Sequence, residues 1–276
     1  DFTNHLEESL QIGVSAKLKP INRKFSNILI CGLGGSGIGG SIVKDLIFSK
    51  AKIPIVSQKD YIIPQFVSDK TLIIVCSYSG NTEETLFALD QCEKMNSEIT
   101  VITSGGKLKK IAEKKNYNHI IIPGGNPPRA MFGYSFVQMF FLLSHYNIIN
   151  DYFKQEIEEA ILLLNKEKED IKKESRNLAK KVYKTTPIIY TDQKIEGAAI
   201  RFRQQINENS KMLCWHHVIP EMNHNELLGW RTNTDNLSVI YLRNKSDFDR
   251  NQVRIEINKK LIEKYTDNIT EIWRKG

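Results

Sequence analysis

Short apolar runs alternate with helix-compatible stretches through the first half of the chain. Runs rich in Ile, Leu and Val predict strands at residues 28–31, 53–56, 72–76, 99–102 and 120–122. The intervening stretches predict helices near residues 39–48, 82–95 and 108–115, and an apolar segment at 131–146 is suited to packing on a sheet. Repeated β–α units with short connections imply a parallel sheet covered by helices on both faces. The pattern therefore predicts an α/β unit with ligands at the carboxyl ends of its strands.

A charged stretch at residues 151–184 contains neither proline nor glycine. Ile157, Leu164, Ile171 and Leu178 recur there at heptad spacing, which predicts one long helix or two nearly continuous helices. A coiled-coil partner helix is the weaker interpretation, because so short a heptad pattern is common in ordinary amphipathic helices. We expect this stretch to open a second domain.

The remaining pattern predicts a second, smaller α/β unit. Strands are expected at residues 187–190, 212–215 and 237–242, and a helix near 195–207. We therefore expect two domains, at residues 1–150 and 151–276, the second one truncated at its C-terminus. A length of 276 residues suits two modest domains with proper cores.

Composition excludes several classes of protein. The chain is 41% hydrophobic and 26% charged, and its net charge of +7 comes from lysines interspersed with glutamates rather than a basic stripe. This argues against nucleic-acid binding. The most apolar run, residues 136–143, is too short to cross a membrane. The four cysteines form no CxxC pair, so we expect buried thiols and a reducing cytoplasm.

Two glycine-rich, serine-bearing turns are the candidates for chemistry. Residues 32–37 (GLGGSG) and 77–82 (SYSGNT) each follow a predicted strand and precede a helix. Backbone N–H groups at the start of a helix attract anions, and nearby hydroxyl groups add donors. Two such turns on one sheet can converge on a single phosphate. The candidate phosphate-binding residues are Gly35, Ser36, Ser77, Ser79 and Thr82.

Two nucleotide-binding interpretations of the first turn fail. It matches GxGxxG, but the acidic residue expected at the end of the next strand is missing, since Asp60 comes late and Lys59 intervenes. The Walker A interpretation lacks its lysine. Glycine turns also occur for backbone reasons alone. The second turn argues against that explanation, because a helix cap needs only one of its three hydroxyls.

The two turns resemble the sugar isomerase (SIS) domain, namely GGSG after one strand and SYSGNTEET after another. Further on, PPRA at residues 127–130, NENSK at 207–211 and EMNHNE at 221–226 are similar to the bifunctional phosphoglucose/phosphomannose isomerase family. The resemblance runs in order from about residue 28 to residue 230. It implies two SIS-like three-layer αβα units with parallel, flavodoxin-like sheets, a phosphosugar substrate and no metal or organic cofactor.

Isomerisation of an aldose 6-phosphate needs ring opening, proton transfer between C1 and C2, stabilisation of an enediolate and a grip on the phosphate. The resemblance implies Glu208 as the base, His224 as the ring-opening residue and Arg129 as the cation facing the enediolate. Asn223, Asn225 and Glu226 surround His224 in the sequence as potential orienting partners. In the family the matching histidine reaches the neighbouring subunit's site, which implies a homodimer.

Several alternatives stay open at this stage. His216, His217, Glu221, His224 and Glu226 invite a metal site, although none forms HExxH. Family members also carry a lysine on a C-terminal helix, and no lysine of this chain sits in a matching motif. A non-catalytic phosphosugar-binding regulator, or a SIS isomerase for a different phosphosugar, are the competing functions.

Overall fold

The structure is a computed structural model that describes residues 2–233 and 235–273. The chain divides into two compact units, Asp1–Leu162 and Leu163–Gly276. The sequence placed the boundary at residue 150, inside the connection between two helices. In the described residues, no helix is long and apolar enough to cross a membrane.

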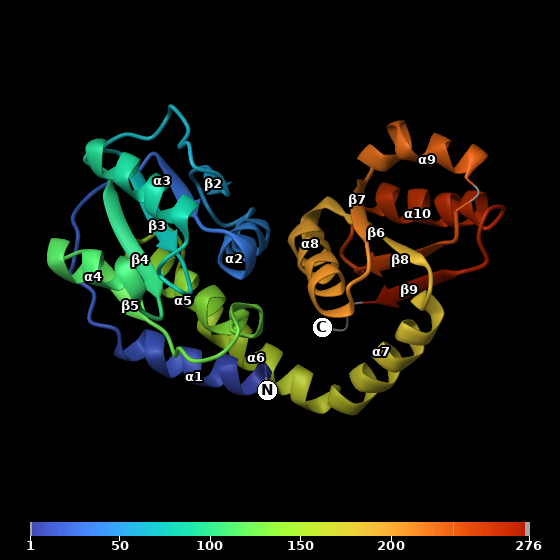
Figure 1. Cartoon of the computed structure of the whole chain (residues 1–276), viewed down its shortest axis with the longest axis horizontal. Coiled ribbons are helices and arrows are strands. Elements are labelled where there is room, and N and C mark those ends of the chain that lie inside the picture. Colours follow the sequence, from blue (N-terminus) through green and yellow to red (C-terminus); the bar gives the residue numbers. More distant parts are fainter. Residues whose placement is uncertain (1, 234, 274–276) are drawn as a thin grey trace. The chain divides into compact units, whose positions relative to one another are not determined.

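The first unit is built on a parallel five-stranded sheet of order β2-β1-β3-β4-β5 (Figure 1). Its strands are β1 (Asn27–Cys31), β2 (Ile55–Gln58), β3 (Thr71–Cys76), β4 (Glu98–Thr103) and β5 (Asn118–Ile121). Its helices are α1 (Phe2–Ser15), α2 (Gly34–Leu46), α3 (Glu83–Lys94), α4 (Gly106–Lys115) and α5 (Phe132–His145). The five predicted strands are confirmed.

Helices cover both faces of this sheet. Leu29, Ile73 and Val101 pack with buried residues of α3 and α4 on one face. On the other face Ile30 lies against Gly40 of α2, which is a position without a side chain. All six residues of β3 are buried, as expected for a central strand covered on both sides.

Helix α1 was not predicted from the sequence, because the residues on its buried face are only weakly apolar. This face consists of Thr3, Leu6, Ser9 and Gly13. Backbone and ring contacts take the place of large side chains: Gln138 of α5 donates to the Ser9 carbonyl at 2.9 Å, and a Cβ at Gly13 would overlap the Phe141 ring. Because these contacts do not need large apolar side chains, the α1 sequence lacks the hydrophobic periodicity that predicts a helix.

Two helices follow α5 in the chain, α6 (Phe153–Lys166) and α7 (Lys168–Val182). Only Glu167 separates them, which confirms the second form of the prediction, two nearly continuous helices.

The second unit contains a parallel four-stranded sheet of order β7-β6-β8-β9. Its strands are β6 (Thr186–Asp192), β7 (Trp215–Ile219), β8 (Leu237–Arg243) and β9 (Ile269–Trp273), with helices α8 (Glu196–Gln205), α9 (Glu226–Gly229) and α10 (Asp249–Ile262). Tyr190 and Tyr241 face a core shared with α10, while Ile189 and Ile240 face α7 and α8. This alternation produces the three-layer αβα arrangement that was predicted for both units.

Two strands of the second unit differ from the prediction. The strand expected at residues 212–215 is wrong except for its last residue, since β7 begins at Trp215 after a left-handed turn at Lys211. Strand β7 carries two histidines and is only partly buried, so its sequence lacks the run of apolar residues that predicts a strand. Strand β9, at the opposite edge of the sheet, was not predicted.

Candidate functional site

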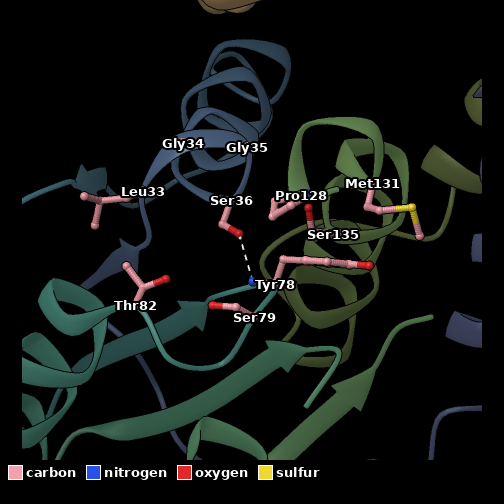
Figure 2. Close-up of a pocket in the computed structure, with 10 residues that line it drawn as sticks. All are labelled: Leu33, Gly34, Gly35, Ser36, Tyr78, Ser79, Thr82, Pro128, Met131 and Ser135. Carbon is pink, nitrogen blue, oxygen red and sulfur yellow. Dashed lines mark hydrogen bonds between the residues drawn. The ribbon is translucent and has the colours of Figure 1, made fainter. Parts of the chain in front are cut away.

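The two serine turns meet at the carboxyl ends of neighbouring strands. The first follows β1 and the second follows β3, and Cys31 pairs in register with Val75. The Tyr78 amide donates to Ser36 Oγ at 3.3 Å, a hydrogen bond that joins one turn to the other (Figure 2). The convergence expected from the sequence is therefore a feature of the first unit.

A cavity of about 240 Å³ lies between these turns and the start of α5. Figure 2 shows the first turn and α2 on one side and the second turn on the other, with Pro128, Met131 and Ser135 from a third segment. The residues that line the cavity are Leu33, Gly34, Gly35, Ser36, Tyr78, Ser79, Thr82, Pro128, Met131 and Ser135. Glycine backbone and hydroxyl groups dominate this set, which suits an anion.

Four of the five candidate phosphate-binding residues line the cavity, namely Gly35, Ser36, Ser79 and Thr82, and Ser77 does not. Ser77 is buried and supports the second turn instead. Its hydroxyl lies 2.9 Å from Thr82 Oγ1 and accepts from the Gly80 amide at 3.2 Å. Ser77 thus fixes where the Thr82 hydroxyl stands.

Close backbone packing explains why Gly37 and Gly80 are glycines. A Cβ at Gly37 would lie 2.2 Å from the Gly32 carbonyl oxygen. Gly80 has φ +67°, and its Cβ would lie 1.8 Å from the Gly105 carbonyl oxygen. These two glycines let each turn pack tightly against neighbouring backbone.

The third side of the cavity was not predicted from the sequence. Pro128, Met131 and Ser135 belong to the α5 region, and only the fold brings them to the turns. Beneath the cavity, burial raises the pKa of the Cys76 thiol to about 12 against the opposing effect of hydrogen bonds with Ser36 and Ser135. This thiol is therefore neutral and packs beside Ser36 and Ser135, two residues that line the cavity.

Arg129 lies on a 3₁₀ turn, Pro128–Ala130, at the rim of this cavity. The Ala130 and Met131 amides donate to the carbonyls of Pro127 and Pro128, at 2.9 and 3.1 Å, which closes the turn. The Pro128 carbonyl also lies within van der Waals reach of a Cβ built at Gly35. The fold thus brings the predicted cation next to the predicted phosphate site.

Glu208 belongs to the second unit, on a π-helical turn, Ile206–Ser210, that continues α8. Asn207 Nδ2 donates to the Met212 carbonyl at 2.8 Å, Lys211 Nζ donates to the Glu208 carbonyl at 2.5 Å, and Lys211 itself is left-handed. The Glu208 side chain is exposed. Burial lowers the pKa of Arg201, and the Glu208 charge partly opposes this effect. Such π-turns in helices are frequent at functional sites.

His224 also belongs to the second unit, on the 3₁₀ turn Glu221–His224 between β7 and α9. It is exposed. The expected orienting partners bond elsewhere: Asn223 to Asn258, Asn225 to Glu221, and Glu226 to Tyr190. Across residues 2–233 and 235–273, the structure has no hydrogen bond to the His224 ring.

Comparison with known proteins places this arrangement in a family. Residues 22–147 match the SIS domain, and residues 171–276 match the bacterial phospho-glucose isomerase C-terminal SIS domain. The chain is 36% identical, over its full length and 84% of the relative, to a bifunctional phosphoglucose/phosphomannose isomerase from Caldicellulosiruptor bescii. The chain belongs to the bifunctional phosphoglucose/phosphomannose isomerase family.

Other comparisons agree with this assignment. A relative of the same name from Thermoplasma volcanium is 34% identical over 86% of this chain and 74% of its own length. Among solved structures, the C-terminal domain of glucosamine-fructose-6-phosphate aminotransferase from Francisella tularensis has a TM-score of 0.75 at 15% identity. That match covers 99% of this chain and 82% of the other, and it shows the shared fold.

The candidate metal ligands of this isomerase do not form one group. His216 lies 3.5 Å from Glu196 and also contacts Arg203, whereas His217 bonds to Glu226. Burial lowers the pKa of His216, and the Arg203 charge adds to the effect. In the part of the chain that the structure describes, no three His, Cys, Asp or Glu side chains gather around a common point.

Proposed function

We propose that this isomerase interconverts glucose 6-phosphate and fructose 6-phosphate, and mannose 6-phosphate with the same ketose. The observation that carries the proposal is the cavity between the two serine turns, with Arg129 on a turn at its rim. In this proposal backbone amides and hydroxyls hold the phosphate, and the Arg129 guanidinium faces the sugar carbons.

In this proposal Glu208 moves a proton between C2 and C1. Both aldoses lose their C2 proton to give the same cis-enediolate, and one base serves both epimers if the pocket lets the C2–C3 bond rotate. Arg129 stabilises the enediolate charge, and His224 transfers the proton that opens the sugar ring. The chemistry requires no cofactor, because the substrate itself is both oxidised and reduced.

We further propose that the enzyme is a cytoplasmic homodimer in which a second copy supplies His224. The exposed His224 ring, held by a turn whose neighbouring side chains bond within the second unit, supports this. The four cysteines are free and buried, which suits a reducing compartment.

A coupled assay tests the activity. Glucose 6-phosphate and mannose 6-phosphate are each offered at increasing concentration with and without a chelator, and glucose and mannose serve as controls without phosphate. We expect turnover of both phosphates that is insensitive to chelator. Binding without turnover would favour a regulatory phosphosugar-binding protein, turnover of another phosphosugar alone would favour a different SIS isomerase, and chelator sensitivity would favour a metal site.

Mixed subunits test the dimer. Glu208→Ala and His224→Ala subunits are each expected to keep only a small residual activity, and mixing them should raise the activity well above that residual level if a site combines residues from two copies. Differently tagged subunits report on exchange. Recovery of no activity in a verified mixed dimer would contradict the donation of His224.

A further inference from the structure

The Glu226 carboxylate binds three donors from two strands of the second unit. Tyr190 on β6 donates its hydroxyl to Oε1 at 2.6 Å, and Trp215 on β7 donates Nε1 to the same oxygen at 3.4 Å. His217, also on β7, lies with Nδ1 2.9 Å from Oε2. One carboxylate at the start of α9 therefore bonds to both the edge strand β7 and its neighbour β6.

The Tyr190 hydroxyl also holds Trp230, which follows α9 in the chain. Trp230, just after α9, donates Nε1 to the Tyr190 oxygen at 3.1 Å, so Tyr190 accepts from Trp230 and donates to Glu226. Tyr190 is fully buried, and burial together with the Glu226 charge raises the pKa of its phenol. The phenol keeps its proton, and the relay from Trp230 to Glu226 stays intact at neutral pH.

The residues before Glu226 are fixed as well. Met222 is fully buried, and Asn223 Nδ2 donates to Asn258 Oδ1 on α10 at 2.6 Å. Asn225 Oδ1 accepts from the Glu226 amide at 2.6 Å. His224 stands between these anchors, exposed, and its place depends on them rather than on a bond to its own ring.

We propose that Glu226 is a positioning residue for His224: its carboxylate locks the end of the 221–226 turn to β6 and β7, and so holds the exposed imidazole for ring opening. This inference rests on the proposed role of His224. Removing the carboxylate frees the turn at its C-terminal end. A displacement of about 1 Å in a catalytic group costs about 100-fold in rate.

A double-mutant cycle tests the proposal. We expect Glu226→Ala to lower kcat about 100-fold in the wild-type enzyme, the cost of a misplaced group, and to cause no further loss in the His224→Ala enzyme. Residues that act as a unit are non-additive in this way. Equal losses in both backgrounds would overturn the proposal. Full activity of His224→Ala would instead overturn the proposed role of His224, and the inference with it.

Further variants separate positioning from folding. Glu226→Gln keeps an acceptor for Tyr190, so it should recover most of the kcat that Glu226→Ala loses. Glu263→Gln removes an exposed carboxylate from the same unit and should change kcat in neither background. Circular dichroism on heating reports whether each variant is folded.

Tyr190→Phe gives an independent answer if Glu226→Ala fails to fold. It removes one donor and keeps the ring, so kcat should fall several-fold in the wild-type enzyme and not at all with His224→Ala. An unchanged kcat in the wild-type background, or an equal fall in both backgrounds, would overturn the proposal.

Discussion

The two sheets of this isomerase offer the same topological place to a ligand, but the residues at that place differ in charge. In each unit the first strand lies between the second and the third, β1 between β2 and β3, and β6 between β7 and β8. Parallel sheets bind ligands at the carboxyl ends of strands beside such a reversal of order. In the first unit this place holds the two serine turns.

In the second unit the same place holds two buried carboxylates. Asp192 ends β6 and accepts from the Lys194 amide and from Asn251, at 2.9 and 2.7 Å. Asp247 follows β8, and one of its oxygens accepts from the Asn244 amide at 2.9 Å. A phosphate would meet negative charge here. The fold therefore provides the place, and the residues of the turns decide whether it binds an anion.

Placing a carboxylate in the cavity of the first unit should remove this difference in charge between the two units. Ser79 lines the cavity and its Oγ accepts from the Asn81 amide at 3.2 Å, a bond that an aspartate can also accept. We expect Ser79→Asp to keep the turn and to raise KM for glucose 6-phosphate by about 100-fold or more, the effect of an unpaired like charge on a held anion. Steady-state kinetics at constant ionic strength measure it.

Ser79→Asn is the matched control for that experiment. Its side chain makes the same turn without a charge, so its KM should rise far less than that of Ser79→Asp. Equal KM values for the two variants would mean that the Ser79 position does not face the phosphate.

The end of β8 should matter for stability rather than for binding. Arg243 is 2% exposed; its Nη1 donates to Glu256 at 2.7 Å and to Glu271 at 2.6 Å, and its guanidinium lies 4.3 Å from the Trp273 ring centroid. Arg243→Met removes this partner from two carboxylates that both keep Lys259, at a cost of about 2 kcal/mol in the free energy of unfolding. Urea unfolding measures this loss.

The control for Arg243 is an exposed arginine of the same unit. Arg250→Met on α10 should change the free energy of unfolding little. Neither variant should alter the affinity for inorganic phosphate, followed by calorimetry. An Arg243→Met enzyme of unchanged stability would show that this ion-pair group does not hold the sheet together.

The cross-turn hydrogen bond gives a smaller effect. Ser36→Ala removes the acceptor of the Tyr78 amide and one hydroxyl from the cavity. A single neutral hydrogen bond is worth about 1 kcal/mol, so KM for glucose 6-phosphate should rise about 5-fold. Ser49→Ala, at an exposed serine just after α2, should leave KM unchanged. An unchanged KM for Ser36→Ala would remove that hydroxyl from the site.

More of the secondary structure of the first unit than of the second could be predicted from the sequence. Strands such as β1 and β3 are buried on both faces, so they appear as continuous apolar runs that a pattern can find. Strand β7 is partly exposed and carries Trp215, His216 and His217, and no pattern of apolar residues marks it. Strands β7 and β9, at the edges of the second sheet, and tightly packed helices such as α1 are determined by contacts that only the fold reveals.

The candidate site shows the same limit. Ser36 and Ser79 stood out because glycine turns after strands have a local cause, the exposed amides at a helix start. Ser135 and Met131 belong to the same cavity, but nothing in their own segment indicates it. Glu226 was grouped with His224 by its place in the sequence. In the structure, the Glu226 carboxylate instead forms hydrogen bonds with Tyr190, Trp215 and His217.

The smallest expected effect concerns the charge of Asp247. The residue is 3% exposed, and one of its oxygens has no hydrogen-bond partner among the described residues. Burial raises the pKa of this carboxyl above its usual range, and the Asp192 charge adds to the effect. A raised pKa in the folded state means that ionisation destabilises the fold. The penalty is absent below the unfolded pKa of about 4 and grows as pH rises through the folded value.

Asp247→Asn should therefore raise the Tm slightly at pH 7, because the amide oxygen still accepts from the Asn244 amide and no charge is buried. The gain should shrink as pH falls toward about 4, where Asp247 itself is protonated. Asp249→Asn, an exposed residue in the first turn of α10, is the control and should lower the Tm, since it removes a charge that favours a helix N-terminus. A gain at Asp247 that does not depend on pH would come from packing. A pH-dependent gain means that the second unit carries a destabilising charge in the place where the first unit carries the hydroxyls of the two serine turns.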